Sequence, residues 1–183
     1  MKRLTILHIG QMIGGLDVYI RNTITYTKSE NRYIIVHGDK DNNRPVERNG
    51  EPVKEYGISL YREMDIWRDT KAIVQALKIV KKERPDLIHC HSAKGGVVGR
   101  VVGFLTCTPT FYTPHAFSFL CTQSQLKRNV YLWIERMTRF KAYLLACSES
   151  ERMLGVNDVH YRTDRAYVWS NAIPDIVYTK EER

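Results

Sequence analysis

The sequence predicts an α/β protein with a doubly wound, mostly parallel sheet, and two observations support this prediction. Short apolar runs of strand length alternate along the chain with segments in which apolar residues recur at helical spacing. Strands separated by helices pair in parallel through right-handed crossovers, which place helices on both faces of the sheet. The 183 residues, 43% of them hydrophobic and 26% charged, suit one globular domain with a full core.

The first part of the chain predicts two strands and one helix. Residues 4–9 (LTILHI) form a compact apolar run that ends at Gly10, as in a strand buried on both faces. Residues 15–27 carry apolar side chains at helical spacing, and residues 32–38 (RYIIVHG) predict the second strand. The polar stretch 39–57 contains Pro, Gly and Asn and is interpreted as a long loop or a poorly formed hairpin.

The middle of the chain predicts a helix, a strand and a second helix. In residues 69–85 (DTKAIVQALKIVKKERP) one apolar stripe is typical of an amphipathic helix, and Pro85 ends it. Residues 86–91 (DLIHCH) predict a strand, and residues 95–106 predict an apolar helix.

The last third continues the alternation of strands and helices, so the whole chain fits one sheet. The elements expected there are a strand at 110–113 (TFYT), a helix over 123–140, a strand in 141–148 (KAYLLACS), a short helix opening in 148–154 (SESERML) and a last strand in 165–174 (RAYVWSNAIP), broken at Pro174.

The helix expected over 123–140 carries one apolar stripe, and its cations lie mostly off that stripe. Two interpretations fit this pattern: a core-facing helix with a solvated opposite face, which we favour, and a helix lying on a membrane surface. The stripe comprises Leu126, Val130, Trp133, Ile134, Met137 and Phe140, and the cations are Lys127, Arg128, Arg136 and Arg139.

The charge balance calls for an anionic partner or surface. The chain has 28 Lys and Arg against 20 Asp and Glu, a net charge of +8. Nucleic acid, phosphorylated small molecules and anionic lipid headgroups all carry the required charge. The basic residues are dispersed, however, and no helix-turn-helix, zinc or RNP-type motif is present, so we expect no nucleic-acid partner.

The cysteines and the N-terminus bear on the compartment. Four cysteines lie far apart without a C-x-x-C pair, and their apolar neighbours suit reduced, buried thiols. The N-terminal apolar run is too short for a signal peptide. We therefore expect a cytoplasmic protein. The cysteines are Cys90, Cys107, Cys121 and Cys147.

Ligands of a doubly wound sheet gather at the carboxyl ends of the strands, and the first such end here is residues 10–17 (GQMIGGLD). It is not a nucleoside-triphosphate loop, because Leu16 and Asp17 stand where Lys and Ser or Thr are required. Gly14 and Gly15 would still let a ligand approach the backbone N–H groups that open a helix. A tight strand-to-helix turn explains these glycines equally well.

The second strand end follows residues 86–91. His89 and His91 alternate on the strand and share one face, so they could chelate a metal, but without a third ligand nearby we favour packing. Ser92 can cap the following helix. Lys94 is unfavourable at a helix N-terminus unless an anion sits there, so we expect it to attract one.

The third and fourth strand ends carry a histidine and a serine. His115 could donate a hydrogen bond to a sugar hydroxyl or to a developing charge, and its place at a strand end favours function over a structural role. Ser148 and Glu151 match the S-x-x-E capping box, with ligand contact as a second use of the serine.

Taken in order, these strand ends resemble the N-terminal domain of family 4 glycosyltransferases, which are retaining enzymes of the GT-B fold. IGGLDVYI is similar to the family's G-G-x-E loop, with Asp17 in place of Glu, and PDLIHCHSAKGG is similar to its D-[IV]-[IV]-H-x-H-[ST] strand end. TPHAFSF is similar to its histidine-bearing loop and ACSESE to its [AV]-x-S-x-x turn. SNAIP resembles the N-G-[IV]-[DP] element that leads into a second domain, with Ala172 in place of Gly.

The resemblance implies that the chain is one half of a two-domain enzyme. In a GT-B enzyme, two Rossmann-like domains face each other across a cleft. The second domain holds most of the nucleotide-sugar donor, and the first holds the acceptor and completes the donor site. Residues 1–174 would then be the Rossmann-like acceptor-side domain and residues 175–183 the start of the interdomain linker, with the C-terminal donor-binding domain absent from the chain.

The resemblance also implies roles for individual residues. His115 would be the catalytic residue that contacts the donor sugar. No metal and no cofactor besides the nucleotide-diphosphate sugar are expected, and the Asp-Lys-Asp of residues 39–41, which matches a metal-binding D-x-D motif, is attributed to chance. The residues expected to contact donor phosphate or acceptor are Gly14, Gly15, Asp17, His91, Ser92, Lys94, Ser148 and Asn171.

The function that this resemblance implies is transfer of a sugar from a nucleotide-diphosphate donor to a polysaccharide or glycolipid acceptor, with retention of configuration. The isolated chain should then be inactive, and the enzyme would make peripheral contact with the inner face of the membrane. The alternative is a non-catalytic interaction subunit that pairs with a separate donor-binding partner. Under either interpretation we expect an exposed apolar patch near residues 100–120.

Overall fold

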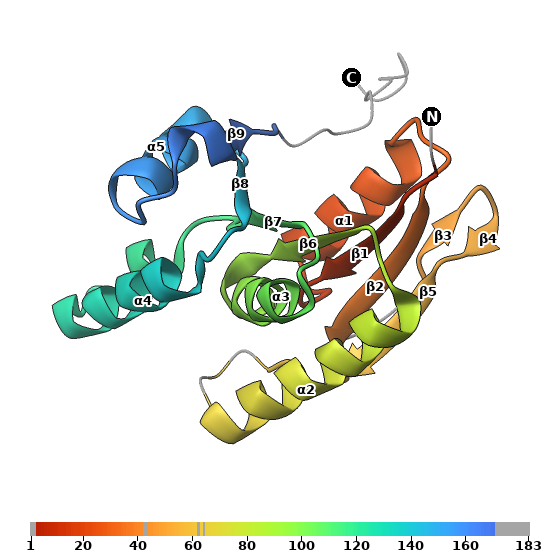
Figure 1. The fold of residues 1–183 in the computed structure, drawn as a ribbon, viewed down its shortest axis with the longest axis horizontal. Coiled ribbons are helices and arrows are strands. Elements are labelled where there is room, and N and C mark those ends of the chain that lie inside the picture. The colour runs from red at the N-terminus through yellow and green to blue at the C-terminus, as the bar shows by residue number, and fades with distance from the viewer. Residues whose placement is uncertain (1–2, 42–43, 62, 64, 171–183) are drawn as a thin grey trace, which may run out of the picture.

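One parallel sheet dominates the computed structural model, which describes residues 3–41, 44–61, 63 and 65–170 (Figure 1). Its strands are β1 (Thr5–Ile9), β2 (Arg32–Gly38), β5 (Lys54–Ile58), β6 (Leu87–His91), β7 (Thr110–Thr113), β8 (Tyr143–Ala146) and β9 (Ala166–Val168). The helices are α1 (Gly15–Tyr26), α2 (Ile66–Glu83), α3 (Ser92–Thr106), α4 (Gln125–Thr138) and α5 (Glu149–Asn157), with 3-10 turns η1 (Ser118–Leu120) and η2 (Thr163–Arg165).

The seven strands lie in the order β5-β2-β1-β6-β7-β8-β9, and all neighbours pair in parallel. Helix α1 lies on one side of this sheet, and α2 and α3 lie on the other (Figure 1). The predicted fold class, a doubly wound and mostly parallel α/β sheet, is confirmed.

The central strands β1 and β6 present different side chains to the two faces. Leu7 and Cys90 belong to the larger core, which includes the buried residues of α2 and α3. Side chains on a strand alternate between faces, so His8 and His91 point the other way, toward α1. There Tyr19 of α1 lies edge-on against His91, with ring centroids 5.6 Å apart. The histidines of both strands therefore gather on the face that α1 covers.

Helix α3 lies very close to β6 and β7 because glycines face the sheet. A Cβ added at Gly99 would lie 2.3 Å from the Cβ of Cys90, and one added at Gly103 would lie 1.9 Å from Oγ1 of Thr110. No real side chain tolerates such distances, so this approach requires glycine. The tight packing fixes the N-terminus of α3 at the end of β6.

The segment 39–57 holds more structure than the sequence analysis predicts. The expected hairpin is present as β3 (Glu47–Arg48) and β4 (Glu51–Pro52), but β5 is a parallel edge strand that the prediction missed. Only Ile58 of β5 is buried, so the strand lacks the continuous apolar run that identifies the central strands.

Helix α4 packs with the opposite face to the one that we favoured. Leu126 and Trp133 of the apolar stripe are 76% and 61% exposed, and Met137 is exposed as well. The buried residue of α4 is Glu135, which is only 2% exposed. The core-facing interpretation of the stripe is therefore wrong.

A buried ion pair explains this orientation of α4. Nη1 of Arg100, on α3, lies 2.9 Å from Oε2 of Glu135, and the hydroxyl of Tyr112 donates to Oε1 of Glu135 at 2.9 Å. The guanidinium also lies 4.0 Å from the centroid of the Tyr112 ring. A buried charge without a partner costs several kcal/mol, so Glu135 must face Arg100. The stripe, on the other side of the helix, then faces solvent.

The cysteines are all free, and only part of their predicted burial is confirmed. Cys90 is buried and Cys147 is half-buried, whereas Cys107 and Cys121 are exposed. Apolar neighbours in sequence did not predict burial for Cys107, which lies just beyond α3, or for Cys121, which lies just beyond η1.

Replacement of Glu135 by Gln should lower the free energy of unfolding by about 3–5 kcal/mol, because Arg100 stays buried without a counter-charge. Urea denaturation of the 183-residue chain measures this loss. The control is Glu149→Gln, which breaks an exposed pair with Arg152 and should move the midpoint little, since exposed pairs contribute little. Equal effects of the two substitutions would contradict the structural role of the buried pair.

Candidate functional site

A pocket of about 550 Å³ opens at the carboxyl ends of β1, β6 and β7. This is the edge of the sheet at which doubly wound folds bind ligands. The pocket brings together three of the predicted site residues, Ser92, Lys94 and His115. Its wall also includes Gln11 after β1 and Glu135 of α4.

The remaining predicted residues are not among those that line this pocket. Gly14 and Gly15 stand at the N-terminus of α1, after β1, where a Cβ would meet no atom within 4 Å. Gly14 has a φ of 58°, which favours glycine. Asn171 lies outside the described residues.

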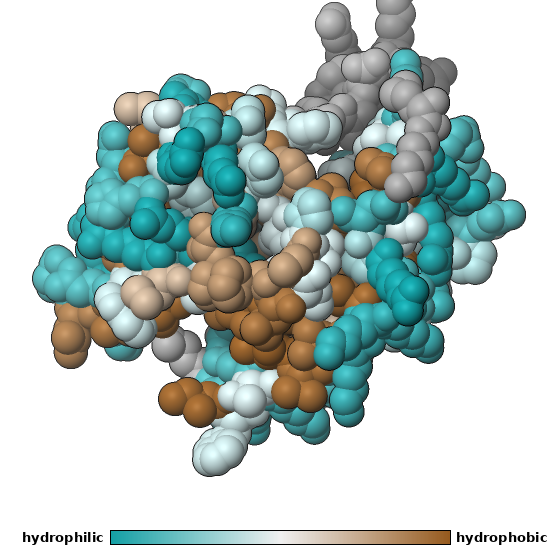
Figure 2. Space-filling model, in the orientation of Figure 1, coloured by the Kyte–Doolittle hydropathy of each residue, from teal (hydrophilic) through white to brown (hydrophobic). Residues whose placement is uncertain are grey.

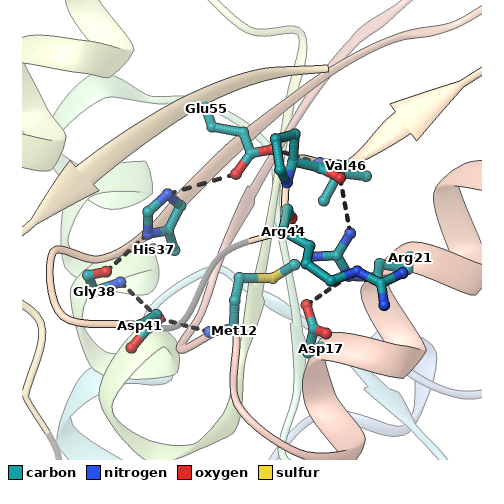
Figure 3. Close-up of polar contacts among 10 residues, drawn as sticks. Met12, Asp17, Arg21, His37, Gly38, Asp41, Arg44, Val46 and Glu55 are labelled. Atoms are coloured by element: carbon teal, nitrogen blue, oxygen red, sulfur yellow. Dashed lines mark hydrogen bonds and ion pairs between the residues drawn. The ribbon is translucent and has the colours of Figure 1, made fainter. Parts of the chain in front are cut away.

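The loop that carries the glycines is held by Asp41, as Figure 3 shows. Oδ2 of Asp41 accepts hydrogen bonds from the backbone N–H of Met12 at 2.6 Å and of Gly38 at 2.9 Å. Burial raises the pKa of the Asp41 carboxyl. The match of residues 39–41 to a metal-binding D-x-D motif was attributed to chance, and this structural role of Asp41 was not predicted, although an Asp in a turn after a strand often binds nearby backbone N–H groups.

Asp17 takes part in a clamp on the same side of the molecule (Figure 3). Its Oδ1 accepts from Nε of Arg21 at 2.8 Å. The other guanidinium nitrogens of Arg21 donate to the backbone carbonyls of Arg44, at 2.5 Å, and of Pro45, at 3.1 Å. Asp17 thus orients an arginine that holds the segment before β3 against α1. This contact gives Asp17 a structural role whether or not it also binds a ligand.

The two polar residues at the start of α3 differ from expectation. Ser92 does not cap the helix: the N-cap residue is His91, no side chain caps it, and Ser92 itself has a φ of 54°. The predicted cap is wrong because the strand runs directly into the helix without an intervening turn. Lys94 has the anion that it requires within the chain, since its Nζ lies 2.5 Å from both carboxylate oxygens of Asp69 on α2.

His115 sits on a backbone turn that a buried carboxylate stabilises. His115 and Ala116 have φ values of 53° and 74°, which cost free energy in residues other than glycine. Oε1 of Glu151 accepts from the N–H of Ala116 at 2.8 Å, and Oε2 accepts from the N–H of Cys147 at 2.7 Å. Ser148 caps α5 as predicted, by accepting from the N–H of Glu151.

Glu151 is therefore a functional candidate that the sequence analysis read only as half of a capping box. Its carboxylate does not close that box but bridges the ends of two strands, from α5 to the His115 turn. The S-x-x-E spacing gave no sign of this bridge, because the turn lies 35 residues earlier in the chain.

A row of histidines runs from the α1 face of the sheet to the pocket. Nδ1 of His8 lies 2.9 Å from Nε2 of His91, and Nδ1 of His91 lies 3.3 Å from Nε2 of His115. Nδ1 of His115 in turn lies 3.6 Å from Sγ of Cys147. His91 thus contacts the catalytic candidate from beneath the pocket.

His8 lies close to His89 and His91 and supplies the third possible metal ligand, which the sequence alone did not reveal. One ligand atom from each of His8, His89 and His91 lies within 4.8 Å of the others, so the three could hold a metal ion. His8 pairs with His89 in the register of β1 and β6, a neighbourhood that only sheet topology reveals. Nε2 of His89 instead lies 2.8 Å from Oγ1 of Thr113.

Burial makes these histidines neutral at neutral pH. It lowers the pKa of His8 and of His115 to about 4, and it lowers the pKa of His89 and His91 well below the ordinary value of 6.5. Each neutral ring carries one proton, so each hydrogen bond between rings has one N–H donor.

The hydrogen bonds assign the proton of each ring. Among the described residues, Nε2 of His8 has no partner, and a buried N–H there would cost more than a bare lone pair. Nδ1–H of His8 then donates to His91, and Nδ1–H of His91 donates to His115. His115 is left with its own Nδ1–H directed at the Cys147 sulfur, a weak acceptor. A substrate oxygen in the pocket could take over this N–H.

Comparison with known proteins adds independent findings. The profile of the family described as Glycosyltransferase Family 4 matches residues 13–175. The UDP-Gal:alpha-D-GlcNAc-diphosphoundecaprenol alpha-1,3-galactosyltransferase of Escherichia coli is 32% identical over 94 residues, which are 51% of this chain and 24% of that protein. The capsular polysaccharide biosynthesis glycosyltransferase CapM of Staphylococcus aureus is 23% identical over 158 residues, 82% of this chain and 39% of that protein.

Solved structures support the fold. Anabaena Alr3699/HepE, in complex with UDP and glucose, matches with a TM-score of 0.65 at 14% identity, over 93% of this chain and 45% of that chain. The chain spans less than half the length of each of these three relatives.

Replacement of Glu151 by Ala should speed hydrogen exchange of the Ala116 and Cys147 amides about 10- to 100-fold, because both N–H groups lose a buried acceptor. Exchange measured by mass spectrometry on short peptides tests this. The control, Glu149→Ala, removes a carboxylate of the same helix that, among the described residues, forms an ion pair only with Arg152, and it should leave both amides protected. Unchanged exchange in Glu151→Ala would show that other contacts hold the turn.

The free energy of unfolding should fall as the pH drops from 7 to 5. The folded protein keeps the pKa of His8 and His115 near 4, below the ordinary 6.5 of an unfolded chain, so the unfolded state binds more protons in this range. Stability is therefore full above pH 6.5 and is lost toward pH 4, by about 2 kcal/mol at pH 5 for each of these two groups. Urea midpoints at the two pH values measure the loss, and His8→Phe should reduce it. A midpoint that does not move between pH 7 and 5 would refute the neutral assignment.

Proposed function

Because the chain belongs to glycosyltransferase family 4, we propose that it is the acceptor-side domain of an enzyme that transfers a sugar from a nucleotide-diphosphate donor to a polysaccharide or glycolipid acceptor. The observation that carries this proposal is the strand-end pocket with His115 in its wall. The relatives support the substrate classes, because one is named for UDP-Gal and a diphosphoundecaprenol-linked acceptor and another for capsular polysaccharide.

In this proposal His115 acts as a hydrogen-bond donor and not as an acid. Its pKa of about 4 leaves the ring neutral at neutral pH, and its Nδ1–H would bind an oxygen of the donor sugar. His91 positions the ring through the bond to Nε2, and Glu151 positions its backbone. A donor held in this way would keep its sugar fixed while charge develops on the leaving diphosphate.

The leaving diphosphate would be stabilised by backbone N–H groups and not by a metal ion. The N-terminus of α1 at Gly14 and Gly15 is open to a ligand, and a helix N-terminus binds phosphate well. His8, His89 and His91, the three possible metal ligands, are engaged in other hydrogen bonds: His8 with His91, and His89 with Thr113. We therefore propose that transfer needs no metal and no cofactor besides the nucleotide-sugar donor. Contacts of Ser92, Lys94, Ser148 and Asn171 with substrate stay predictions.

The proposal extends to the domain organisation of the complete enzyme. Residues 1–174 would form the acceptor-side domain and residues 175–183 the start of a linker to a donor-binding domain. We expect the isolated chain to be inactive and the complete enzyme to retain the anomeric configuration, as the family resemblance implies. A glycolipid acceptor would bring the enzyme to the inner face of a membrane as a peripheral protein.

Transfer by the full-length protein tests the proposed function. A panel of UDP-sugars is offered with a GlcNAc-diphosphopolyprenol acceptor, and the product is followed by mass spectrometry. His115→Ala should lower kcat about 10²-fold, with a smaller change in KM, because the hydrogen bond that holds the donor sugar in its reacting orientation is lost. The control is His160→Ala, another histidine with positive φ, which is exposed and does not line the pocket.

The outcome separates the enzyme from the interaction subunit. Unchanged turnover in His115→Ala would remove this residue from the mechanism. Absence of transfer with every UDP-sugar, together with restoration of transfer when a separate donor-binding protein is added, would favour the subunit.

A further inference from the structure

The outward face of α4 carries an apolar stripe, and most globular proteins would bury such a stripe against their core. We define the α4 stripe as Leu126, Val130, Trp133, Met137 and Phe140, which are spaced by three and four residues and are all exposed. At about 100° per residue, this spacing puts the four side chains that lie within α4 on one side, roughly opposite Glu135. Phe140 follows two residues beyond the end of the helix and has a positive φ of 41°. The stripe is therefore the side of α4 that the buried ion pair turns away from the core.

The apolar surface continues from α4 onto the end of α3. The rings of Phe140 and Phe104 stack with centroids 4.5 Å apart, and Phe104 and Leu105 are both exposed. Leu120 in η1 is exposed as well, so large apolar side chains reach solvent in the region 100–120 where an exposed apolar patch was expected. Figure 2 shows hydrophobic residues gathered over α3 in the middle of this face of the molecule. A surface of this extent on a monomer usually marks a binding site.

The two charged residues of α4 that flank the stripe are both positive. Lys127 and Arg136 lie on its two flanks, about 100° to either side. The only carboxylate of α4, Glu135, is buried against Arg100, and no carboxylate among the described residues pairs with either flanking cation. Nε of Arg136 donates to a backbone carbonyl, that of Asp158, so its charge stays uncompensated.

We propose that the α4 stripe docks onto an anionic lipid bilayer, with the helix lying in the plane of the interface. Leu126, Val130 and Met137 would enter the acyl boundary, and Trp133 would lie at headgroup depth, where indole rings are favoured. Lys127 and Arg136 have aliphatic stems that follow the apolar surface while their charges reach lipid phosphates.

Charge complementarity selects this occupant over a second copy of the chain. A second copy would oppose like charges across the stripe, whereas an anionic headgroup layer complements them. No helix in the described part of the chain is long and apolar enough to cross a bilayer, so the contact would be superficial.

The docked orientation would bring the pocket to the membrane. Lys127, Ile134 and Glu135 of α4 line the pocket as well, so a membrane under the stripe would lie beside its mouth. A lipid-linked diphosphate could then reach Lys127 without leaving the bilayer. This consequence rests on the proposed function, whereas the docking itself does not.

Co-flotation of the 183-residue chain with vesicles tests the docking. The chain should float with vesicles made of equal parts phosphatidylcholine and phosphatidylglycerol, float poorly with phosphatidylcholine alone, and be released from the anionic vesicles by high salt. Val130→Glu and Trp133→Glu should weaken binding tenfold or more. The matched control is Val74→Glu: Val74 is an exposed valine of α2, 45% exposed against 41% for Val130, and its replacement should leave flotation unchanged.

Several results would overturn the inference. These are failure of the chain to float with anionic vesicles, equal loss of binding in Val74→Glu, and formation of a dimer that Val130→Glu abolishes while vesicles are not bound. Circular dichroism of each variant before flotation checks that it is folded. A full-length protein that floats but transfers no sugar would sink the proposed function and leave the docking intact.

Discussion

The buried pair of Arg100 and Glu135 sets the arrangement of the side of the molecule that carries the pocket. Two full charges can lie in a protein interior only when they face each other and find further hydrogen bonds. Here the Tyr112 hydroxyl donates to Glu135, and Arg100 donates to the Tyr161 hydroxyl. This requirement fixes the rotation of α4 about its own axis. The same carboxylate forms part of the pocket wall, so pocket shape and helix orientation have one common cause.

The part of the pocket wall that His115 forms depends on the burial of the histidines and on the hydrogen bonds between them. This histidine sits on a backbone turn with positive φ. Against its ring lie the ring of Tyr19, with centroids 4.6 Å apart, and the neutral imidazole of His91, which in turn contacts the neutral imidazole of His8. Desolvation removes their charge, and hydrogen bonds between the rings then set the direction of each N–H. The ring that reaches the pocket is in this way a fixed dipole, which suits binding and orientation better than proton transfer at neutral pH.

The fold could be predicted from the sequence because its central strands are buried on both faces and read as unbroken apolar runs. β2 was predicted with its observed bounds, and β7 likewise. β5 was missed because an edge strand needs few apolar residues. The stripe on α4 was correctly recognised but placed on the wrong side, since periodicity shows that a helix has two faces without showing which one meets the core.

The candidate site was predictable only where its parts are local. The strand ends identified His115 and Lys94 as neighbours of one pocket, because parallel strands end at one edge. The partners of these residues were not predictable: Asp69 lies 25 residues before Lys94, and His8 lies 83 residues before His91. Such pairs arise from topology, and no short motif contains both members.

The bridge formed by Glu151 has a mechanical consequence. One carboxylate ties the amide of Ala116 to that of Cys147, and it belongs to the first turn of α5. The turn that carries His115 and the helix α5 are therefore joined into one rigid unit. Any closing movement of that turn over a bound sugar must either break two buried hydrogen bonds or swing α5 with it.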